Sequence, residues 1–598
     1  MQTKYILGVI LIAVIVVAGS AYYFMSAPPS ELEQHGGTLV IADMEEPTAI
    51  APGSNEMQGI IKQNLMDTLC QYRTDSCYVD SLMPRLAESW ETSSDGKVIT
   101  LHLVQNATFH CGREFNATTA KWALDYAMET GFPFTAPWIP NMDRDNYPPW
   151  GHEYVDRWTV KVHFVAPIPY WLALEATTHT GTLLGSCPYH MEAAGYDHPQ
   201  FGQYGVPGGV GVCGTGPYKF VEWVPGDHIT MEANDNYFMG RPNIDKLIYR
   251  FIPDATIRAL ELETKGVDCI MGRMGCVTSQ DIPRLETTEG IILSKTNGIA
   301  NPWIQVGIYD LGIAANKSIT YTPRWPMSDI RFRKALYQLF DWDNLVTMAA
   351  PHGTVKVIHS LLSCSFDASA HEQHLLEDIL PAYNEAEAIA TINALKAERP
   401  FNNFTRGNTL FILAYAGEQY KRLGEFIASK LIEIGIPAAI EQPTAGVRNE
   451  ISYKGEFDLQ LGINGKSVID PAFALNDQFY ASYPSKYIIL PNGTRLYGTI
   501  YYPLVLGRID ELCGLVTSMV DSPERRTLLY ELDDKITALF LAFTVGREVT
   551  YWAYWDYVKP GLVTNPLGQT TIANTMYKQV WGVDTYHPWL DLEKAPAR

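Results

Sequence analysis

Two groups of side chains in this sequence have the types and spacing that chemistry requires. Cys187 and His190 have the CxxH spacing of zinc ligands, but no second pair with a matching spacing accompanies them. Asp143 and Asp145 resemble the paired carboxylates of a glycoside hydrolase, although acidic residues this close together in a loop are usually solvated. The pattern therefore predicts neither a metal site nor a pair of catalytic acids.

Other catalytic motifs are absent from the sequence. It contains no P-loop, no GxSxG, no HExxH and no dinucleotide-binding fingerprint. We therefore expect a protein that is not an enzyme and that holds no cofactor. A binding protein needs less, namely aromatic rings that stack on a ligand and a few polar groups that orient it. With 14 Trp and 34 Tyr the chain has many such rings, most of which we expect in the core.

The composition indicates a folded, acidic protein with more than one lobe. A chain of 598 residues is longer than a single hydrophobic core usually supports. Its 46% apolar and 19% charged residues are ordinary for a globular protein. The excess of Asp and Glu gives a net charge of -21, which repels nucleic acid, so we expect no nucleic-acid partner.

The N-terminus carries a long apolar segment. Residues 5–25 contain no charged side chain, and a helix of this length can cross a bilayer core of about 30 Å. With Lys4 on the cytoplasmic side, the rest of the chain lies outside. We therefore expect residues 1–26 to form an anchor at the extracytoplasmic face of the cell membrane and residues 27–36 to form a linker. A cleaved signal peptide followed by secretion is the alternative, because residues 18–20 are small.

The cysteines suit an oxidising exterior, where disulfides persist. Cys70 with Cys77, and Cys269 with Cys276, could each close a short loop. Cys111, Cys187 and Cys213 could share one further bridge, and Cys364 and Cys513 another. The connectivity does not follow from spacing alone, and an odd number of cysteines leaves one thiol over.

Hydrophobic patterning indicates strands that alternate with helices. Strands are predicted at 38–42 (TLVIA), 98–103 (VITLHL) and 158–164 (WTVKVHF). Helices are predicted at 117–129, after the N-cap residue Asp329, at 424–435, and after Ser522 and Pro523. This alternation indicates an α/β fold.

Seven segments, in the same order along the chain, match the motifs of one family. They are 83–91 (MPRLAESWE) with the following Asp95-Gly96 and 108–110, then 214–220 (GTGPYKF), 265–268 (KGVD), 329–341 (DIRFRKALYQLFD), 382–384 (AYN), 431–436 (LIEIGI) and 470–471 (DP). The chain resembles the extracellular solute-binding proteins of the peptide and nickel class, which includes oligopeptide- and dipeptide-binding proteins of ABC importers. The segment 214–220 is the most specific of these matches.

The resemblance implies a periplasmic-binding-protein-like fold with two α/β lobes, a hinge and an inserted α+β domain. Lobe I would comprise residues 37–60, 214–301 and 558–598, and the inserted domain residues 61–213. Lobe II would comprise residues 302–557. The two hinge crossings would then lie near Trp303 and Trp555.

The function implied by the resemblance is that of a substrate-binding subunit. Such a protein closes its lobes over an oligopeptide-sized solute outside the cell and delivers it to an ABC permease and its ATPase. We expect a monomer. The alternatives are an oligosaccharide-binding subunit of the same importer class, a secreted glycoside hydrolase, and an adhesion or sensory protein with the same fold.

The ligand-binding residues predicted from this resemblance lie in loops and at the hinge. They are Glu46 and Thr48 after the first strand, Trp303 at the hinge, Tyr415 and Gly417 in the segment YAGE, and Asn464, Ser467 and Asp470 in the segment NGKSVID. Each has a structural alternative: Trp303 could be a core residue, Asp470 could cap its own turn, and Glu46 could be ordinary surface.

One departure from the family affects the expected ligand. Peptide-binding relatives carry an Asp three residues before the Asp-Pro step, where it pairs with the α-amino group of the ligand, and Ser467 stands there in this chain. A hydroxyl cannot neutralise an ammonium group. The positions of a family Arg and Trp are likewise taken by Leu461 and Asn464. The missing clamp favours an uncharged ligand such as an oligosaccharide.

Overall fold

The computed structural model describes most of the chain after residue 35. The described residues are 36–53, 59–72, 82–130, 141–168, 171–176, 181–197, 201–271, 276–297, 301–313, 319–353, 355–356, 358–362, 369–415, 417–464, 472, 475, 479–480, 487–489, 495–497, 500–505, 507–519, 522–559 and 589–596. The predicted anchor and the site candidates Ser467 and Asp470 lie outside them. None of the helices in these ranges combines the length and the apolar character that crossing a bilayer requires.

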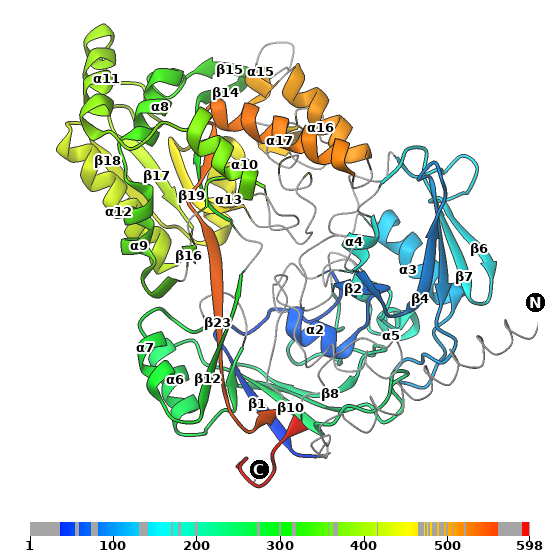
Figure 1. The fold of residues 1–598 in the computed structure, drawn as a ribbon. Helices are drawn as coiled ribbons and strands as arrows, with labels where there is room; N and C mark the ends of the chain where they lie inside the picture. Colours follow the sequence, from blue (N-terminus) through cyan, green and yellow to red (C-terminus); the bar gives the residue numbers. More distant parts are fainter. Residues whose placement is uncertain are drawn as a thin grey trace, which may run out of the picture.

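An eight-stranded mixed sheet lies at the bottom of the view in Figure 1. Its strands run in the order β12-β23-β11-β1-β10-β9-β8, and β16 joins it through β23. β1 is parallel to both β10 and β11, and its apolar residues from Leu39 to Ala42 are all buried, as is typical of a central parallel strand. The strands are β1 (Thr38–Asp43), β8 (Tyr218–Val224), β9 (His228–Ala233), β10 (Lys246–Phe251), β11 (Cys269–Ile270), β12 (Ile291–Asn297), β16 (Val355–Lys356) and β23 (Arg547–Trp555).

A second, five-stranded sheet lies at the upper left of Figure 1. Its order is β18-β17-β19-β13-β22, and β17 is parallel to both of its neighbours. The strands are β13 (Asn301–Val306), β17 (Leu410–Ala414), β18 (Ala438–Glu441), β19 (Leu459–Asn464) and β22 (Ala542–Thr544). The helices of this part are α8 (Ile330–Gln338), α9 (Trp342–Ala349), α10 (Ser369–His374), α11 (Glu385–Glu398), α12 (Glu418–Glu433), α13 (Ala445–Lys454), α15 (Tyr502–Val505), α16 (Arg508–Ser518) and α17 (Pro523–Ala538).

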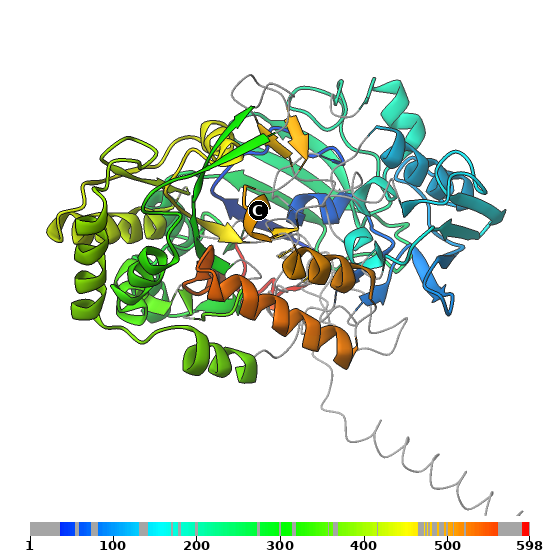
Figure 2. The same cartoon turned by 90° about the horizontal axis from the view of Figure 1, so that it is seen from above.

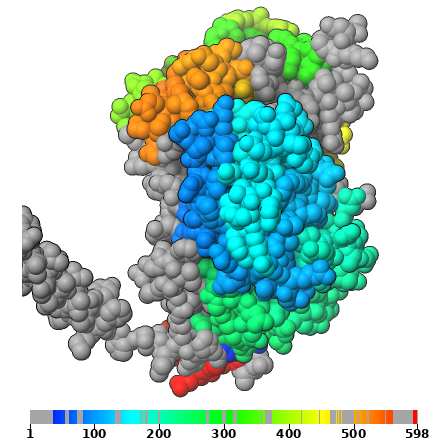
Figure 3. Space-filling view, turned by 90° about the vertical axis from the view of Figure 1, so that its right-hand side faces the viewer, coloured from blue at the N-terminus to red at the C-terminus, as the bar shows by residue number. Residues whose placement is uncertain are grey.

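A four-stranded antiparallel sheet, β4-β5-β7-β6, lies on the other side of the molecule from α11 and α12 in both Figure 1 and Figure 2. Its strands are β4 (Ala87–Thr92), β5 (Val98–Leu103), β6 (His152–Asp156) and β7 (Thr159–His163). Residues of this region cover the centre of the face in Figure 3, below the orange helices of 508–538. The nearby helices are α2 (Gly59–Leu65), α3 (Ala117–Glu129), α4 (Trp171–Glu175) and α5 (Pro188–Ala193).

Shorter elements complete the described chain. They are α6 (Ala255–Glu263), α7 (Ile282–Thr287) and the strand pairs β2 (Cys70–Tyr72) with β3 (Leu82–Pro84), β14 (Tyr309–Ile313) with β15 (Ile319–Pro323), β20 (Tyr487–Ile489) with β21 (Arg495–Tyr497), and β24 (Val558–Lys559) with β25 (Trp589–Leu590).

Buried apolar side chains form two large clusters. The first gathers residues from 39–291 and 552–590, and the second gathers residues from 303–545. Residues of 61–213 belong to the first cluster, so the region expected as an inserted domain shares a continuous core with the eight-stranded sheet. Each of the two larger sheets therefore packs in a separate hydrophobic core.

The chain passes from the first hydrophobic core to the second between β12 and β13 and returns between β22 and β23, while β16 also joins the first sheet by pairing with the start of β23. Trp303 lies just after the first passage, in β13. The second passage leads from β22 into β23, whose residues from Val549 to Trp555 pair with β12 in the first sheet. In Figure 1 this strand runs down from the upper part of the molecule to the lower sheet.

Local sequence signals located several elements well. α3 and β5 have the predicted bounds, Asp329 caps α8 by accepting from the backbone N–H of Arg331, and Ser522 caps α17. α12 begins at Glu418, earlier than the predicted residue 424.

The cysteine pairing differs from expectation. Cys269 and Cys276, which could have closed a short loop, are both buried and are not joined by a disulfide. The Cys276 thiol lies 3.8 Å from Oδ1 of Asp43. Cys70 and Cys513 are also free in the structure, and their predicted partners lie outside the described residues.

Candidate functional site

The carboxyl ends of the parallel strands in both large sheets lie on the side where the chain crosses between them. In the first sheet β1, β10 and β11 end on the side where Asn297 of β12 pairs with Val549 of β23. In the second sheet Asn464, the last residue of β19, pairs with Asn301, the first residue of β13. Ligands of open α/β sheets bind outside the carboxyl ends of their strands. The candidate site therefore lies between these two edges.

Glu46 follows β1 at the first edge, but its carboxylate is used inside the protein. It accepts hydrogen bonds from the indole N–H of Trp223 at 2.7 Å and from the backbone N–H of Gly226 at 2.9 Å. These contacts tie the loop after β1 to the turn between β8 and β9. Thr48 is exposed two residues further on. Glu46 is thus placed to hold the loop, and ligand contact by Glu46 or Thr48 remains a prediction.

Tyr415 lies at the second edge, directly after β17. Its backbone N–H donates to the carbonyl of Leu461 at 2.9 Å, which extends the pairing with β19. A Cβ on Gly462 would lie 3.0 Å from Cδ2 of Tyr415, so glycine at this position leaves room for the ring over the strand. The side chain of Tyr415 is half-buried. Tyr415 therefore keeps part of its surface exposed at this edge.

Gly417 shapes the same loop. Its φ of 125° is unfavourable for any residue with a Cβ. The side-chain amide of Gln442, which follows β18, donates to the carbonyls of Tyr415 and Gly417, the latter at 3.0 Å. The loops after β17 and β18 are therefore held together at this edge.

Arg448 was not predicted from the sequence, yet it contributes the cation at this edge. It lies in the first turn of α13, and its Cζ is 3.6 Å from the centroid of the Tyr415 ring, a cation–π contact. The side chain is buried, and its Nε has no hydrogen-bond partner among the described residues. Sequence patterning could not indicate it because α13 has no strong apolar face and the contact with Tyr415 is non-local.

The remaining site candidates fall into two groups. Trp303 is 3% exposed and packs edge-to-face against Phe479 in the second core, so its indole is a core group in this structure. Asn464 is placed at the end of β19 by its backbone pairing. Ser467 and Asp470 lie outside the described residues, so their contact with a ligand stays a prediction.

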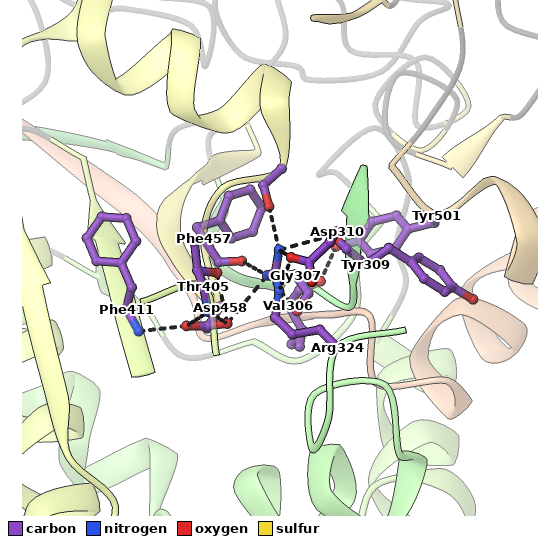
Figure 4. A network of polar contacts seen from close by, with 11 residues as sticks. Val306, Gly307, Tyr309, Asp310, Arg324, Thr405, Phe411, Phe457, Asp458 and Tyr501 are labelled. Atoms are coloured by element: carbon purple, nitrogen blue, oxygen red, sulfur yellow. Dashed lines mark hydrogen bonds and ion pairs between the residues drawn. The ribbon is translucent and has the colours of Figure 1, made fainter. Parts of the chain in front are cut away.

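A cavity of about 370 Å³ lies at the opposite edge of the second sheet. It is lined in part by Arg324, whose side chain donates to Asp310, to Asp458 and to the carbonyl of Phe457, as Figure 4 shows. Phe457 and Asp458 directly precede β19, so this cavity lies at the amino edge, away from the crossings. Because the contacts of Arg324 are all internal, we assign this network to stability of the fold.

Comparison with known proteins decides the family. Residues 81–486 match the family model described as bacterial extracellular solute-binding proteins, family 5 Middle. The chain belongs to this family. The match confirms the resemblance drawn from the sequence motifs and supports an extracytoplasmic location for this family 5 protein.

Curated relatives of this family 5 chain are solute-binding proteins. Heme-binding protein A of Haemophilus influenzae is 24% identical over 47% of this chain and 48% of its own length. Oligopeptide-binding protein AppA of Bacillus subtilis is 25% identical over 39% of this chain and 40% of its own. Glutathione-binding protein GsiB of Pectobacterium atrosepticum is 25% identical over 76% and 79%. The chain thus spans about half the length, or less, of the first two relatives.

Solved structures confirm the fold of this family 5 chain. Dipeptide-binding protein from Pseudoalteromonas sp. SM9913 in complex with Met-Leu has a TM-score of 0.69 at 17% identity and covers 90% of this chain and 99% of its own. The periplasmic binding protein DppA of Helicobacter pylori in complex with the peptide STSA has a TM-score of 0.67 at 18% identity and covers 91% and 99%. The fold is therefore that of the periplasmic binding proteins, as the sequence predicted.

Proposed function

We propose that this family 5 protein is the substrate-binding subunit of an ABC importer and captures a peptide or a similar solute outside the cell. The observation that carries this proposal is the arrangement of the two large sheets, whose parallel strands both end at the side where the chain crosses between them. A ligand bound there contacts both sheets at once. Its binding energy then favours the closed arrangement that a permease would recognise.

The proposed lobes follow the predicted division with one changed boundary. Lobe I comprises residues 37–60, 214–301 and 558–598, joined by β23, and the inserted domain comprises 61–213. Lobe II ends before Arg547, because β23 pairs with strands of the first sheet. The two connections between β12 and β13 and between β22 and β23 act as the hinge.

The proposed ligand is a peptide or related solute with an anionic group. Arg448 presents a guanidinium beside the half-buried ring of Tyr415, and an arginine binds a carboxylate with two parallel hydrogen bonds. Ser467 offers no negative charge to the α-amino group of a ligand. Its presence does not affect how Arg448 would bind a carboxylate of the ligand. An oligosaccharide is not favoured, since the relatives named above bind heme, peptides or glutathione.

Titration calorimetry of the full chain with short peptides tests this proposal. Arg448→Met should weaken binding of a peptide with a free carboxylate by about 2 kcal/mol or more, roughly thirtyfold. An amidated peptide, which lacks the carboxylate, should bind wild type and variant alike. Arg331→Met is the matched control, because Arg331 is 52% exposed and pairs with Asp329 and Glu398 on the surface.

The outcomes separate the two parts of the proposal. If wild type binds peptides and Arg448→Met binds the free carboxylate equally well, the role of Arg448 is wrong while the binding function stands. If wild type binds none of the peptides, the assignment of a peptide-like solute is wrong.

The partners and the membrane attachment complete the proposal. We propose that a monomer works with an ABC permease and its ATPase and is retained at the membrane by residues 5–25, whose uncharged sequence is long enough to span a bilayer. Expression of the full chain and of a chain without residues 1–26, followed by membrane fractionation, tests the anchor. Wild type should sediment with membranes, whereas a mature chain found in the medium would show that the segment is cleaved.

A further inference from the structure

Four side chains that can bind a metal ion converge in the region between β5 and β8. Cys111, Cys187, His190 and Cys213 offer ligand atoms that all lie within 4.8 Å of one another. The sequence predicted no metal site because only Cys187 and His190 have ligand spacing, and Cys111 precedes Cys187 by 76 positions. The fold supplies the second pair of ligands that the CxxH segment lacks.

Two distances in this cluster match the edges of a metal-centred tetrahedron. The sulfurs of Cys111 and Cys187 are 3.8 Å apart, and Nδ1 of His190 is 3.4 Å from the sulfur of Cys187. Tetrahedral zinc, with bonds of about 2.3 Å to sulfur and 2.0 Å to nitrogen, sets its ligand atoms about 3.5–3.8 Å apart. A disulfide needs sulfurs about 2.05 Å apart. The spacing therefore suits a shared cation better than a bridge.

The start of α5 positions two of the ligands. Cys187 is the N-cap residue of this helix, and Pro188 occupies its first turn. Residues three apart on a helix lie on the same side, so Cys187 and His190 face the same point. α5, which holds His190 and begins after Cys187, is labelled near β4 of the four-stranded sheet in Figure 1.

Backbone contacts position the loop of Cys213. The N–H of Cys187 donates to the carbonyl of Cys213 at 2.9 Å. The hydroxyl of Tyr204 accepts from the N–H of Cys213 and donates to its carbonyl, each at 3.1 Å. These contacts hold the ligand in place before an ion arrives, as the outer partners of metal ligands commonly do.

Two contacts position Cys111. The neighbouring N–H of His110 donates to the carbonyl of Gly214 at 2.7 Å, which joins its loop to that of Cys213. The guanidinium of Arg113 lies 4.0 Å from the ring centroid of Tyr189, which joins the same loop to α5.

We propose that Cys111, Cys187, His190 and Cys213 bind one structural zinc ion. Thiolate and imidazole ligands suit zinc, and four protein ligands leave no open position for a substrate. The ion would tie three loops together, at 111, 187–190 and 213. Cys111 and His190 are exposed while Cys187 and Cys213 are buried, so an ion can enter from the surface.

Metal analysis of the full chain, purified with a reductant and loaded with zinc, tests this site. Wild type should retain one zinc per chain after dialysis. Cys111→Ser and His190→Asn should each lose it, and both residues are exposed, so these variants are expected to fold. Cys513→Ala, which removes a buried thiol outside the cluster, should retain the zinc.

Cobalt substitution provides a second readout. Co²⁺ in wild type should give the intense visible absorption of a tetrahedral site and thiolate charge-transfer bands in the near ultraviolet, and Cys111→Ser, which should not hold the ion, should lose both. Zinc uptake well below one per chain in reduced wild type, or equal uptake by wild type and both ligand variants, would overturn the proposal. The proposal would also be overturned if the three cysteines form a disulfide and the chain takes up no zinc after that disulfide is reduced.

Discussion

Replacing Arg324 by Met tests the network at the amino edge of the second sheet. Arg324 is 2% exposed, and it donates to the carbonyl of Phe457 at 2.6 Å and to Asp310 at 2.9 Å. Its Nη1 lies 3.4 Å from Oδ1 of Asp458, whose side chain is fully buried. Asp458 in turn accepts from the N–H of Phe411 at 2.8 Å and from Thr405. Methionine fills a similar volume but provides neither the charge nor the donors.

The expected loss of stability comes from the buried carboxylate of Asp458, which remains after Arg324 is replaced. Burial raises the pKa of Asp458, and the charge of Arg324 opposes this rise. Without the arginine, Asp458 keeps the desolvation cost and loses its countercharge. Breaking a buried ion pair in this way costs about 3–5 kcal/mol. We therefore expect the free energy of unfolding to fall by about that amount.

Urea unfolding, followed by circular dichroism, measures this loss. Arg331→Met, which breaks an exposed ion pair, should unfold like wild type. Adding Asp458→Asn to Arg324→Met should recover part of the stability, since the double variant leaves no uncompensated charge. A loss below about 1 kcal/mol in Arg324→Met would refute the reasoning, because it would match an exposed pair and not a buried one.

Three further changes test individual contacts. Burial raises the pKa of Glu175 to about 8, above its unfolded value near 4.5, so the folded chain retains a proton that the unfolded chain releases. The free energy of unfolding should therefore fall as the pH rises from about 4.5 to 8, by up to about 1.4 kcal/mol per pH unit. Thermal melts of Glu175→Gln should lack this pH dependence. Equal pH profiles for wild type and variant would contradict the buried, protonated Glu175. Glu46→Ala should lower the free energy of unfolding by about 1–3 kcal/mol, since it leaves the indole N–H of Trp223 without its acceptor. Unchanged stability would contradict this role, and a loss of peptide affinity would support the predicted ligand contact. Gly417→Ala should cost about 1–3 kcal/mol in the urea unfolding assay, because its φ of 125° strains any residue with a Cβ. Gly407→Ala, at a φ of 69° with open space around it, should cost less. Equal losses in the two variants would contradict a strained backbone at Gly417.

The features that the sequence predicted well depend on local chemistry. Asp329 and Ser522 cap helices by hydrogen bonds within three residues, so these two helices could be located from residue types alone. The family motifs extended the prediction from local elements to the whole fold, because they cover the chain at intervals.

The features that the sequence did not predict depend on contacts between distant segments. Arg448 joins Tyr415 only once β17 and α13 meet at one edge, and the pairing of Cys111 with Cys187 and Cys213 requires three loops to converge. The aromatic type of Trp303 does not show that it packs against Phe479 in the second core, at 3% exposure, and its contact with a ligand stays a prediction. β23 could not be assigned to the first sheet because strand pairing is set by the partner strands and not by composition.

The central claim is that the chain binds a solute between its two sheets and releases it unchanged. Native mass spectrometry of the full chain with a peptide mixture, followed by denaturation and mass analysis of the released ligand, tests it most directly. We predict one ligand per chain, recovered with its original mass. Release of cleaved or otherwise converted peptide would contradict the account, and so would a chain that binds no member of the mixture.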